Sequence, residues 1–326
     1  MPIISIIMPA YNVERYIEKT IQLIQRQTFK DFELLIVDDG SSDNTYDLCK
    51  KYVAQDSRIK ILHKDNGGVS AARNYGLDRM TGQFMTFIDS DDWITDDYLQ
   101  YLYSLILEKD DVQISMLVGK QVSEKSEILD VQETFREVIS AKEAIIRMLT
   151  RDVFTHENWG KLYRVNLWRN IRFPEDIIYD DLNTTYRVFA EADKVACGNA
   201  IKYSYVQRAG SLMHSKCSKR TLSVLDVVDD ITEYLVKRWP DIMPYAVDMQ
   251  VQTYMKNLQM ILNSGTKEFR IEEERILSCV RKNAGLLLIN ARVPRNDKIK
   301  VLTLLINKRL FLWLYNLHDG NIKVVE

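Results

Sequence analysis

Short apolar runs alternate with amphipathic segments over the first 118 residues. The runs predict strands at Ile3–Met8, Glu33–Val37, Ile59–Leu62, Phe84–Ile88 and Val112–Val118. The first two runs are apolar at successive positions, as in parallel strands that are covered on both faces. After Asn12, apolar residues recur at spacings of three and four, which predicts a helix capped by Asn12. The alternation indicates βαβ units with parallel strands.

The rest of the chain changes character twice. Residues 119–214 show a mixed pattern, with an alternating strand at 201–205. Beyond residue 215 the helical period dominates, and it predicts helices at 219–239, 244–263, 269–284 and 297–317. We therefore predict an α/β domain in two halves, 1–118 and 119–214, followed by a helical region at 215–326.

Composition narrows the class of protein. The chain has 326 residues, of which 46% are hydrophobic, and a formal net charge of −2, so no basic excess indicates a nucleic-acid partner. Its four cysteines contain no C-x-x-C pair, which favours neither a zinc cage nor a disulfide framework and fits a reducing cytoplasm. The apolar run at the N-terminus is too short for a signal peptide, and no stretch reaches the ~20 residues of a membrane span. We expect a cytoplasmic protein, either soluble or peripheral at the inner face of the membrane.

Polar motifs follow four of the predicted strands. They are Pro9-Ala10-Tyr11-Asn12, Asp38-Asp39-Gly40-Ser41, Asn66-Gly67-Gly68 and Asp89-Ser90-Asp91-Asp92. A single aspartate at a strand end is more often a turn former or a helix cap. Four motifs at carboxyl ends of parallel strands, however, line one crevice, which is where open α/β sheets bind ligands. The pattern therefore predicts a ligand site at this edge.

The residue types in these motifs suit a phosphate-bearing ligand. Asp89 and Asp91 are spaced so that one carboxylate reaches a divalent metal and the other reaches the metal or a ribose hydroxyl. Arg73, which lies in a stretch that opens a helix, could contact a phosphate beside that helix N-terminus. The alternative for Arg73 is a surface arginine with an apolar stem.

Together these motifs closely resemble glycosyltransferase family 2, the enzymes of bacterial surface polysaccharide synthesis. The resemblance is strong over the first ~115 residues and moderate over 155–214. It implies the GT-A fold, an α/β, Rossmann-like, mixed and mostly parallel sheet flanked by helices, here with a C-terminal helical region. It also implies a site in which Pro9, Tyr11, Asp39 and Asn66 lie at the donor nucleobase, Arg73 at the diphosphate, Asp89 at the ribose and Asp91 on a Mn²⁺ or Mg²⁺ ion.

The resemblance continues in the second half. Asp180-Asp181 resembles a Glu-Asp pair of the family at the start of a helix, with Asp180 in place of the glutamate, and it implies that Asp181 is the catalytic base. A run from Tyr203 to Ser211 resembles the segment that folds over the diphosphate, which makes Arg208 and Ser211 candidates; its alternative is an edge strand and turn. His214 could approach the metal or be an ordinary histidine. Trp159 is either a platform for an acceptor sugar or a buried core residue.

The function implied is inverting transfer of a sugar from a nucleotide-sugar donor, most often a UDP-sugar, to a hydroxyl of a glycan acceptor. Residues 1–118 would bind the nucleotide sugar and 119–214 the acceptor. A lipid-linked acceptor and a homo-oligomer stay open. One displacement needs no covalent nucleophile, and no nucleophile constellation is present in the sequence.

The sequence bears on three alternative functions. A dinucleotide-dependent oxidoreductase would carry G-x-G-x-x-G after the first strand, where Pro9-Ala10-Tyr11-Asn12 stands. A sugar nucleotidyltransferase would carry a glycine-rich loop at the same place. An inactive family member could serve as a nucleotide- or glycan-binding assembly subunit, against which the intact Asp91 and Asp181 argue.

The last predicted helix mixes apolar and basic residues. Between Lys298 and Leu317 the apolar residues are Leu302, Leu305, Ile306, Leu310, Trp313 and Leu314, among Lys298, Lys300, Lys308 and Arg309. This mixture suits a helix that lies in a membrane interface. Packing against the catalytic domain or a dimer contact would explain it as well.

Overall fold

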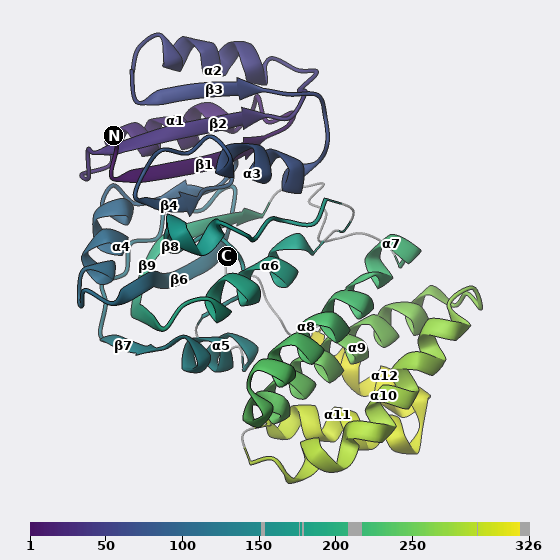
Figure 1. Ribbon diagram of the computed structural model, residues 1–326. Helices are drawn as coiled ribbons and strands as arrows, with labels where there is room; N and C mark the ends of the chain where they lie inside the picture. Colours follow the sequence, from purple (N-terminus) through teal and green to yellow (C-terminus); the bar gives the residue numbers. More distant parts are fainter. Residues whose placement is uncertain (151–153, 176, 178, 208–216, 292, 320–326) are drawn as a thin grey trace. The chain divides into compact units, whose positions relative to one another are not determined.

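The computed structural model describes residues 1–150, 154–175, 177, 179–207, 217–291 and 293–319. The chain divides into two compact units (Figure 1). Unit 1 comprises Met1–Asp176 and Asp180–Ala209, and unit 2 comprises Ile177–Tyr179 and Gly210–Glu326. The boundary predicted at residue 214 lies outside the described residues.

One sheet forms the centre of unit 1. Its described strands are β1 (Ile4–Ala10), β2 (Phe32–Asp38), β3 (Ile59–His63), β4 (Phe84–Phe87), β5 (Trp93–Ile94), β6 (Val112–Ser123), β7 (Arg136–Ser140), β8 (Lys161–Arg164) and β9 (Lys194–Gln207). The strand order is β3-β2-β1-β4-β8-β6-β9-β5, with β7 paired to β9. Strands β1 to β4 run parallel, and β9 runs parallel to β6. Strand β8 is antiparallel to both β4 and β6. The predicted Rossmann-like mixed sheet is confirmed.

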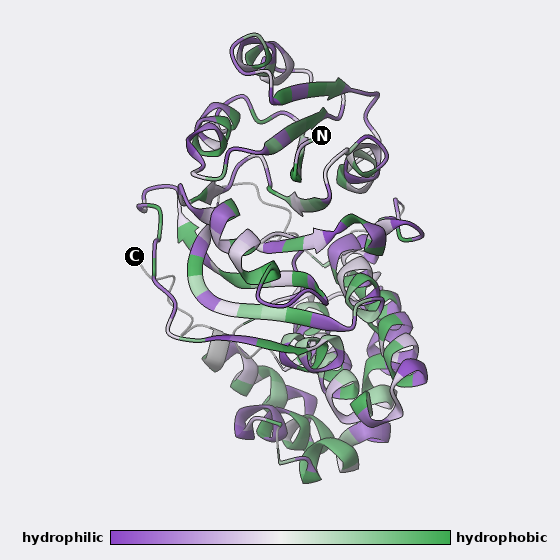
Figure 2. Ribbon diagram, turned by 60° about the vertical axis from the view of Figure 1, so that its left-hand side comes forward, coloured by the Kyte–Doolittle hydropathy of each residue, from purple (hydrophilic) through white to green (hydrophobic). Residues whose placement is uncertain are grey.

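Helices cover this sheet. They are α1 (Ile17–Arg26), α2 (Thr45–Val53), α3 (Val69–Leu77), α4 (Tyr98–Ile106), α5 (Ala141–Leu149) and α6 (Asp180–Ala190). Figure 2 shows hydrophobic residues concentrated along the strands, whereas the helices carry both hydrophobic and hydrophilic residues. Helix α3 packs closely on β1, since a Cβ at Gly76 would lie 2.6 Å from the side chain of Ile7. A glycine at this position therefore lets the helix that carries Arg73 approach the sheet.

One local prediction for unit 1, the helix cap at Asn12, is wrong. Helix α1 begins at Ile17 after Tyr16, so Asn12 is not its cap. Asn12 instead has a positive φ of 51° and lies in the loop before the helix. Strand β6 runs through residue 118, so the two predicted halves share one continuous strand. The described part of the run that starts at Tyr203 is not at the edge of the sheet, because β6 and β5 both pair with it.

Unit 2 is helical throughout its described part. Its helices are α7 (Lys219–Leu222), α8 (Val224–Arg238), α9 (Met243–Ser264), α10 (Arg270–Ile289), α11 (Arg295–Ile306) and α12 (Lys308–Asp319). The helix predicted at 219–239 breaks near Ser223, and that predicted at 297–317 breaks at Asn307. The Asn307 side chain accepts a hydrogen bond of 2.7 Å from Arg309 N, which starts α12. None of the described helices is long and apolar enough to cross a membrane.

Candidate active site

The four polar motifs follow strands that end at one edge of the sheet. In the register of the parallel pairs, Ala10 lies opposite Asp38, and Asp38 lies opposite His63. The Asp39 amide then donates to the Ala10 carbonyl at 2.9 Å, so the turns after β1 and β2 leave the sheet together. Strand β4 ends beside β1. The predicted convergence of the motifs is confirmed, because parallel strands place their carboxyl ends on one side.

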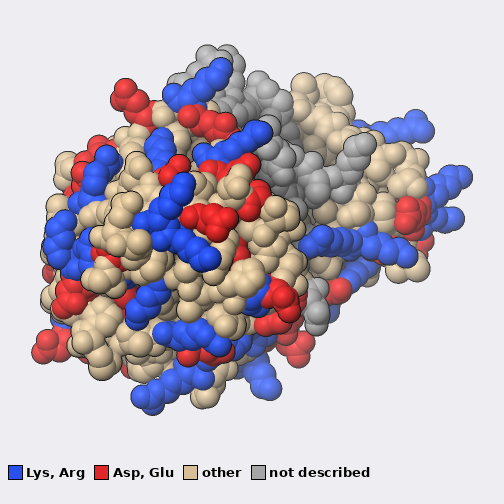
Figure 3. All heavy atoms as spheres, turned by 90° about the horizontal axis from the view of Figure 1, so that it is seen from above, with Lys and Arg blue, Asp and Glu red and all other residues tan. Residues whose placement is uncertain are grey.

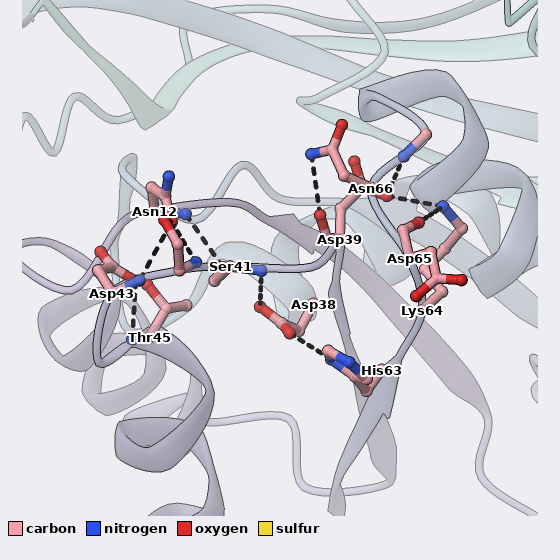
Figure 4. A network of polar contacts seen from close by, with 12 residues as sticks. Asn12, Asp38, Asp39, Ser41, Asp43, Thr45, His63, Lys64, Asp65 and Asn66 are labelled. Carbon is pink, nitrogen blue, oxygen red and sulfur yellow. Dashed lines mark hydrogen bonds and ion pairs between the residues drawn. The ribbon is translucent and has the colours of Figure 1, made fainter.

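Asn12 ties the loop after β1 to the loop after β2 (Figure 4). Its side-chain carbonyl accepts hydrogen bonds from Ser42 N at 2.8 Å and from Asp43 N at 3.4 Å. The main-chain N–H of Asn12 donates to Ser41 Oγ at 3.0 Å. The positive φ of Asn12 is a conformation that asparagine tolerates better than most residues. Asn12 therefore holds the two loops in a fixed relation next to Tyr11, which is 51% exposed.

Asp39 is anchored by the loop after β3. Its Oδ1 accepts from Lys64 Nζ at 2.7 Å and from Gly67 N at 3.0 Å, and its Oδ2 accepts from Gly68 N at 2.7 Å. Asn66 Nδ2 donates to the main-chain carbonyl of Asp39 at 3.0 Å. Since a carboxylate offers about four acceptor positions, one position on Asp39 is left for a ligand donor. The structure thus brings Asp39 and Asn66 together, as the sequence predicts.

Two further residues of these motifs, Pro9 and Asp38, are buried. Pro9 lies within β1, opposite Val37. Next to Asp39, Asp38 is fully buried, and its Oδ2 lies 2.6 Å from His63 Nδ1. The sequence did not predict that His63 and Lys64 contact the two aspartates of the turn after β2. What could have indicated it is their position at the end of the predicted strand at 59–62, just before the Asn66-Gly67-Gly68 motif.

Arg73 joins two distant segments. Its Nη2 lies 3.2 Å from Asp89 Oδ1 at the end of β4, and its Nη1 lies 2.9 Å from Asp180 Oδ2 at the start of α6. Ser70 Oγ donates to the same Asp180 oxygen at 3.0 Å. Arg73 is only 7% exposed, which rules out the surface-arginine alternative. Its Nε has no partner in the described structure, so the guanidinium keeps a donor for a further acceptor.

Asp180 and Asp181 have different surroundings although they are neighbours at the start of α6. Asp180 is buried and engaged by Arg73 and Ser70. Burial raises the pKa of Asp181, and the Asp180 carboxylate adds to the rise, while His156 and Arg73 oppose it. A raised pKa makes a carboxylate a stronger base. Asp180 is thus held in an ion pair, whereas burial raises the pKa of Asp181, whose role as the base stays a prediction.

Tyr203 fixes the acidic turn at residues 89–92, after β4, by two hydrogen bonds. The Tyr203 hydroxyl donates to Asp92 Oδ2 at 2.7 Å and accepts from Asp89 N at 3.2 Å. Burial, together with the Asp89 and Asp91 carboxylates, raises the pKa of Asp92 well above its ordinary value. Asp92 is fully buried, and its two oxygens accept from Tyr203 and from Val206 N, so it faces the protein interior. Asp91 is half-buried in the same turn, and its role as a metal ligand stays a prediction. Among the described residues no group of three or more His, Cys, Asp or Glu is arranged to hold a metal ion.

A second segment, residues 156–161, lies beside α6. The ring of His156 stacks on that of Tyr186, with centroids 6.3 Å apart. Lys161 is buried, and its ammonium donates to the Glu157 and Trp159 carbonyls. Burial lowers the pKa of Lys161 to about 8, against the attraction of the Glu157 and Asp181 carboxylates. No role for Lys161 was visible in the sequence, because its burial depends on segments that meet only after folding.

Several buried polar atoms of this region lack partners within the described structure. They are Glu157 Oε2, Asn158 Nδ2, Thr184 Oγ1 and Thr185 Oγ1. Buried polar atoms are normally hydrogen-bonded, and exceptions call for a ligand, a water molecule or a functional reason. Trp159, by contrast, is 8% exposed and stacks on Tyr203 at 4.6 Å, so it is a buried core residue and not a sugar platform.

Three sequence candidates lie outside the described residues: Arg208, Ser211 and His214. Their predicted roles at the diphosphate and the metal stay predictions. On the face that Figure 3 shows, basic and acidic side chains are interspersed over the described residues. This face therefore presents no broad field of one sign among the described residues.

The sequence matches the family model described as Glycosyl transferase family 2 over residues 5–171. Among curated relatives, glycosyltransferase GlyA of Streptococcus pneumoniae is 32% identical over 80% of this chain and 38% of its own length. Glycosyltransferase GlyG of the same organism is 30% identical over 76% of this chain and 83% of its own length. The match thus spans well under half of GlyA and most of GlyG.

Solved structures share the fold. S. aureus TarS 1-349 in complex with UDP-GlcNAc has a TM-score of 0.66 at 20% identity and covers 97% of this chain and 91% of its own. The mannosyltransferase PcManGT from Pyrobaculum calidifontis, in complex with GDP-Man and Mn²⁺, has a TM-score of 0.55 at 15% identity, with 100% and 88% covered. At these identities the likeness establishes the GT-A fold.

Proposed function

The chain belongs to glycosyl transferase family 2, and on that premise we propose that it transfers a sugar from a nucleotide-sugar donor to a hydroxyl of a glycan acceptor with inversion at the anomeric carbon. The donor we propose is a UDP-sugar. TarS, which shares the fold, binds UDP-GlcNAc, and this supports the choice.

The observation that carries the proposal is the position of Arg73. Its guanidinium contacts Asp89 from the donor-side turn and Asp180 from the helix that carries Asp181. A cation held between these two carboxylates, with its Nε unpartnered, lies where the diphosphate of a donor would meet an acceptor. Neither segment alone would define a transfer site.

The donor would bind across the strand ends of β1 to β4. We assign the nucleobase to Tyr11 and Asp39, with Pro9 and Asn66 at its edges. The remaining acceptor position of Asp39 suits an N–H of the base. Asp89 would accept from the ribose, and Arg73, with Arg208 and Ser211, would hold the diphosphate. These assignments rest on the family resemblance and on the contacts above.

Asp91 would hold a Mn²⁺ or Mg²⁺ ion together with oxygens of the diphosphate. A divalent ion supplies charge neutralisation for the departing nucleoside diphosphate. The feature of this chain that supports a cation there is the Asp89-Ser90-Asp91 turn at the end of β4, where Asp89 also meets the Arg73 guanidinium. The Mn²⁺ in the PcManGT complex supports the same ligand chemistry.

Asp181 would act as the base. The oxygen of the acceptor hydroxyl forms a bond to the anomeric carbon while the bond from that carbon to the diphosphate oxygen breaks. The hydroxyl proton passes to Asp181, and the electron pair leaves with the diphosphate. Arg73 and Arg208 would stabilise the charge that develops there. One displacement of this kind inverts the configuration.

A screen of nucleotide sugars tests the proposal. Purified protein is incubated with single donors and with glycan or lipid-linked acceptors, and the release of nucleoside diphosphate and the anomeric configuration of the product are scored. We expect one donor to give an inverted product. A protein that binds nucleotide sugars but neither hydrolyses nor transfers any of them would be an assembly subunit. A retained configuration would refute the single displacement.

The biological setting we propose is the synthesis of a cell-surface polysaccharide at the cytoplasmic side of a membrane. Nucleotide sugars are charged and are made in the cytoplasm, and the free cysteines in the structure suit a reducing compartment.

A further inference from the structure

The exposed apolar residues of the described chain are concentrated near its end. Of the 16 large hydrophobic residues that are exposed, seven lie between residues 299 and 317. They are Ile299, Leu302, Leu305, Ile306, Leu310, Trp313 and Leu317. We call these seven residues the α11–α12 apolar surface. Ile306 is 75% exposed and Trp313 is 60% exposed. A single exposed apolar residue is ordinary, whereas a group of them on neighbouring helices calls for an explanation.

On α11 the exposed residues share one face. Ile299, Leu302 and Ile306 follow the spacing of three and four that places side chains on one side of a helix, and Leu305 lies next to them. Val301 and Leu304 are buried on the other side. The helix is therefore apolar on both faces, and only one of them is covered by unit 2.

Helix α12 repeats the arrangement. Leu310, Trp313 and Leu317 are exposed at the same spacing. Phe311 and Tyr315 are buried on the opposite face, with their rings 5.4 Å apart. One face of α12 is therefore packed within unit 2. The opposite face is exposed although the helix is packed.

Basic residues flank the exposed faces. Arg295 and Lys298 precede Ile299 and Leu302 by four residues, on the same side of α11, and Arg309 precedes Trp313 by four residues on α12. None of these three has an ion-pair partner in the described part of the chain. Lys300 and Lys308, in contrast, pair with Asp297 and Glu273 within unit 2. The basic residues beside the apolar surface are thus distinct from the two lysines that form ion pairs within unit 2.

We propose that the α11–α12 apolar surface binds an anionic membrane surface, with the apolar side chains in the acyl boundary and Arg295, Lys298 and Arg309 at the phosphate headgroups. Apolar residues beside long cationic side chains suit this interface, because the cations extend to the headgroups while their stems stay apolar. A two-fold contact with a second copy would face like charges in the same patch, which is unfavourable. The proposal does not depend on the sugar that the protein transfers.

Vesicle flotation tests the proposal with the full chain and no donor or acceptor. We expect the protein to float with vesicles of phosphatidylcholine and phosphatidylglycerol at low salt, and roughly tenfold less with pure phosphatidylcholine. The variant Leu302→Glu with Trp313→Glu should lose binding about tenfold or more. Ile271→Glu, at a residue of unit 2 that is 80% exposed and outside the surface, is the matched control and should float normally.

Two further measurements separate the outcomes. Lys298→Gln with Arg309→Gln should weaken binding to anionic vesicles by about tenfold or more and reduce its salt dependence, since each basic residue near a charged surface contributes roughly fivefold. Sedimentation velocity reports self-association. Failure of the full chain to float, or equal flotation of the Leu302→Glu, Trp313→Glu variant, would overturn the proposal. So would a dimer that the same variant dissociates, because the surface would then be a contact between copies. Retained secondary structure and thermal unfolding show that each variant folds.

Discussion

The two sides of the candidate active site differ in how their buried polar atoms are satisfied. On the proposed donor side, which comprises the loops at residues 10–14, 39–45 and 63–68, the carboxylate of Asp39 accepts three hydrogen bonds from the protein. The proposed acceptor side comprises residues 156–161 and α6. There, a buried polar atom is unpartnered in the described structure at each of four residues: Glu157, Asn158, Thr184 and Thr185.

This difference indicates two kinds of ligand recognition. A donor side whose groups are held by the protein is preorganised, so it loses little freedom when a nucleotide binds. An acceptor side with unpartnered buried groups is costly until a ligand or water supplies partners. Hydroxyl-rich sugars would supply them. Substitutions on the two sides should therefore affect different steps of the reaction.

The largest effect is expected on the acceptor side at Asp181. Asp181→Asn removes the proposed base and should lower the rate of transfer by roughly 10²- to 10⁴-fold, the usual contribution of general-base assistance. Donor binding should be nearly unchanged, because Asp181 is not among the donor-side groups. Single-turnover transfer and calorimetric titration of the donor nucleotide, measured on the same preparation, test both halves of this prediction.

Asp180→Asn is the matched control for that substitution. It removes the same charge one residue away, where the carboxylate is engaged by Arg73 and Ser70. We expect a smaller loss of transfer, about tenfold, mainly through weaker acceptor affinity. If Asp180→Asn is inactive and Asp181→Asn transfers normally, the two roles are exchanged. If both transfer normally, the base lies elsewhere.

The next largest effect concerns the metal. Asp91→Asn should lower transfer by about 10² to 10³, as expected for the loss of several kcal/mol of charge stabilisation. Excess chelator should have a similar effect on the unmodified protein, with recovery on addition of Mn²⁺ or Mg²⁺. Asp96→Asn, which changes an exposed carboxylate nearby, serves as the control. Full activity in excess chelator would show the assignment to be wrong.

The pH dependence of transfer should reveal the environment of Asp181. Burial raises its pKa, and a base is inactive when protonated, so the rate should fall about tenfold per pH unit as the pH drops below that raised pKa. The acid limb should lie above the ordinary aspartate pKa of about 4. The residual activity of Asp181→Asn should lack the limb. An unshifted limb, or one that persists in the variant, would assign it to another group.

The smallest effect is expected on the donor side at Lys64. Lys64→Met removes the ammonium that lies 2.7 Å from Asp39 Oδ1, while the two glycine amides still hold the carboxylate. Donor affinity should fall roughly threefold to tenfold, the net contribution of about one ordinary hydrogen bond, because the other two bonds to the carboxylate remain. The single-turnover rate at saturating donor should be unchanged. Lys51→Met, an exposed lysine of α2, controls for the lost charge.

A result that reverses this order would contradict the comparison. If Lys64→Met lowered the single-turnover rate and left donor affinity intact, the donor side would take part in the chemical step. The preorganised role assigned to Asp39 and its loop would then be wrong.

Much of the fold followed from local patterns. Strands β1 to β4 were predicted within two residues, and β6 was predicted at its start but five residues too short, since runs of apolar residues are visible in the sequence. Strand β5, of two residues, was not predicted. The helix that starts at Asp180 was implied by the family resemblance and is present. The capping role of Asn12 was wrong, because its side chain bonds to Ser42 and Asp43 about 30 residues away, and no local pattern reports that choice. The helix predicted at 297–317 was broken by one extended residue, Asn307.

The sequence by itself determined at which edge of the sheet the polar motifs lie. Parallel strands place their carboxyl ends on one edge, so motifs that follow successive strands must meet there. Only the tertiary structure decided which partners the charged groups take: Arg73 pairs with Asp180, 107 residues away, and Tyr203 bonds to Asp92. Likewise, the composition of α11 and α12 was plain, but only packing decided which apolar face stays exposed. The physical reason is that periodicity and strand ends depend on neighbours in the chain, whereas ion pairs and burial depend on segments that meet after folding.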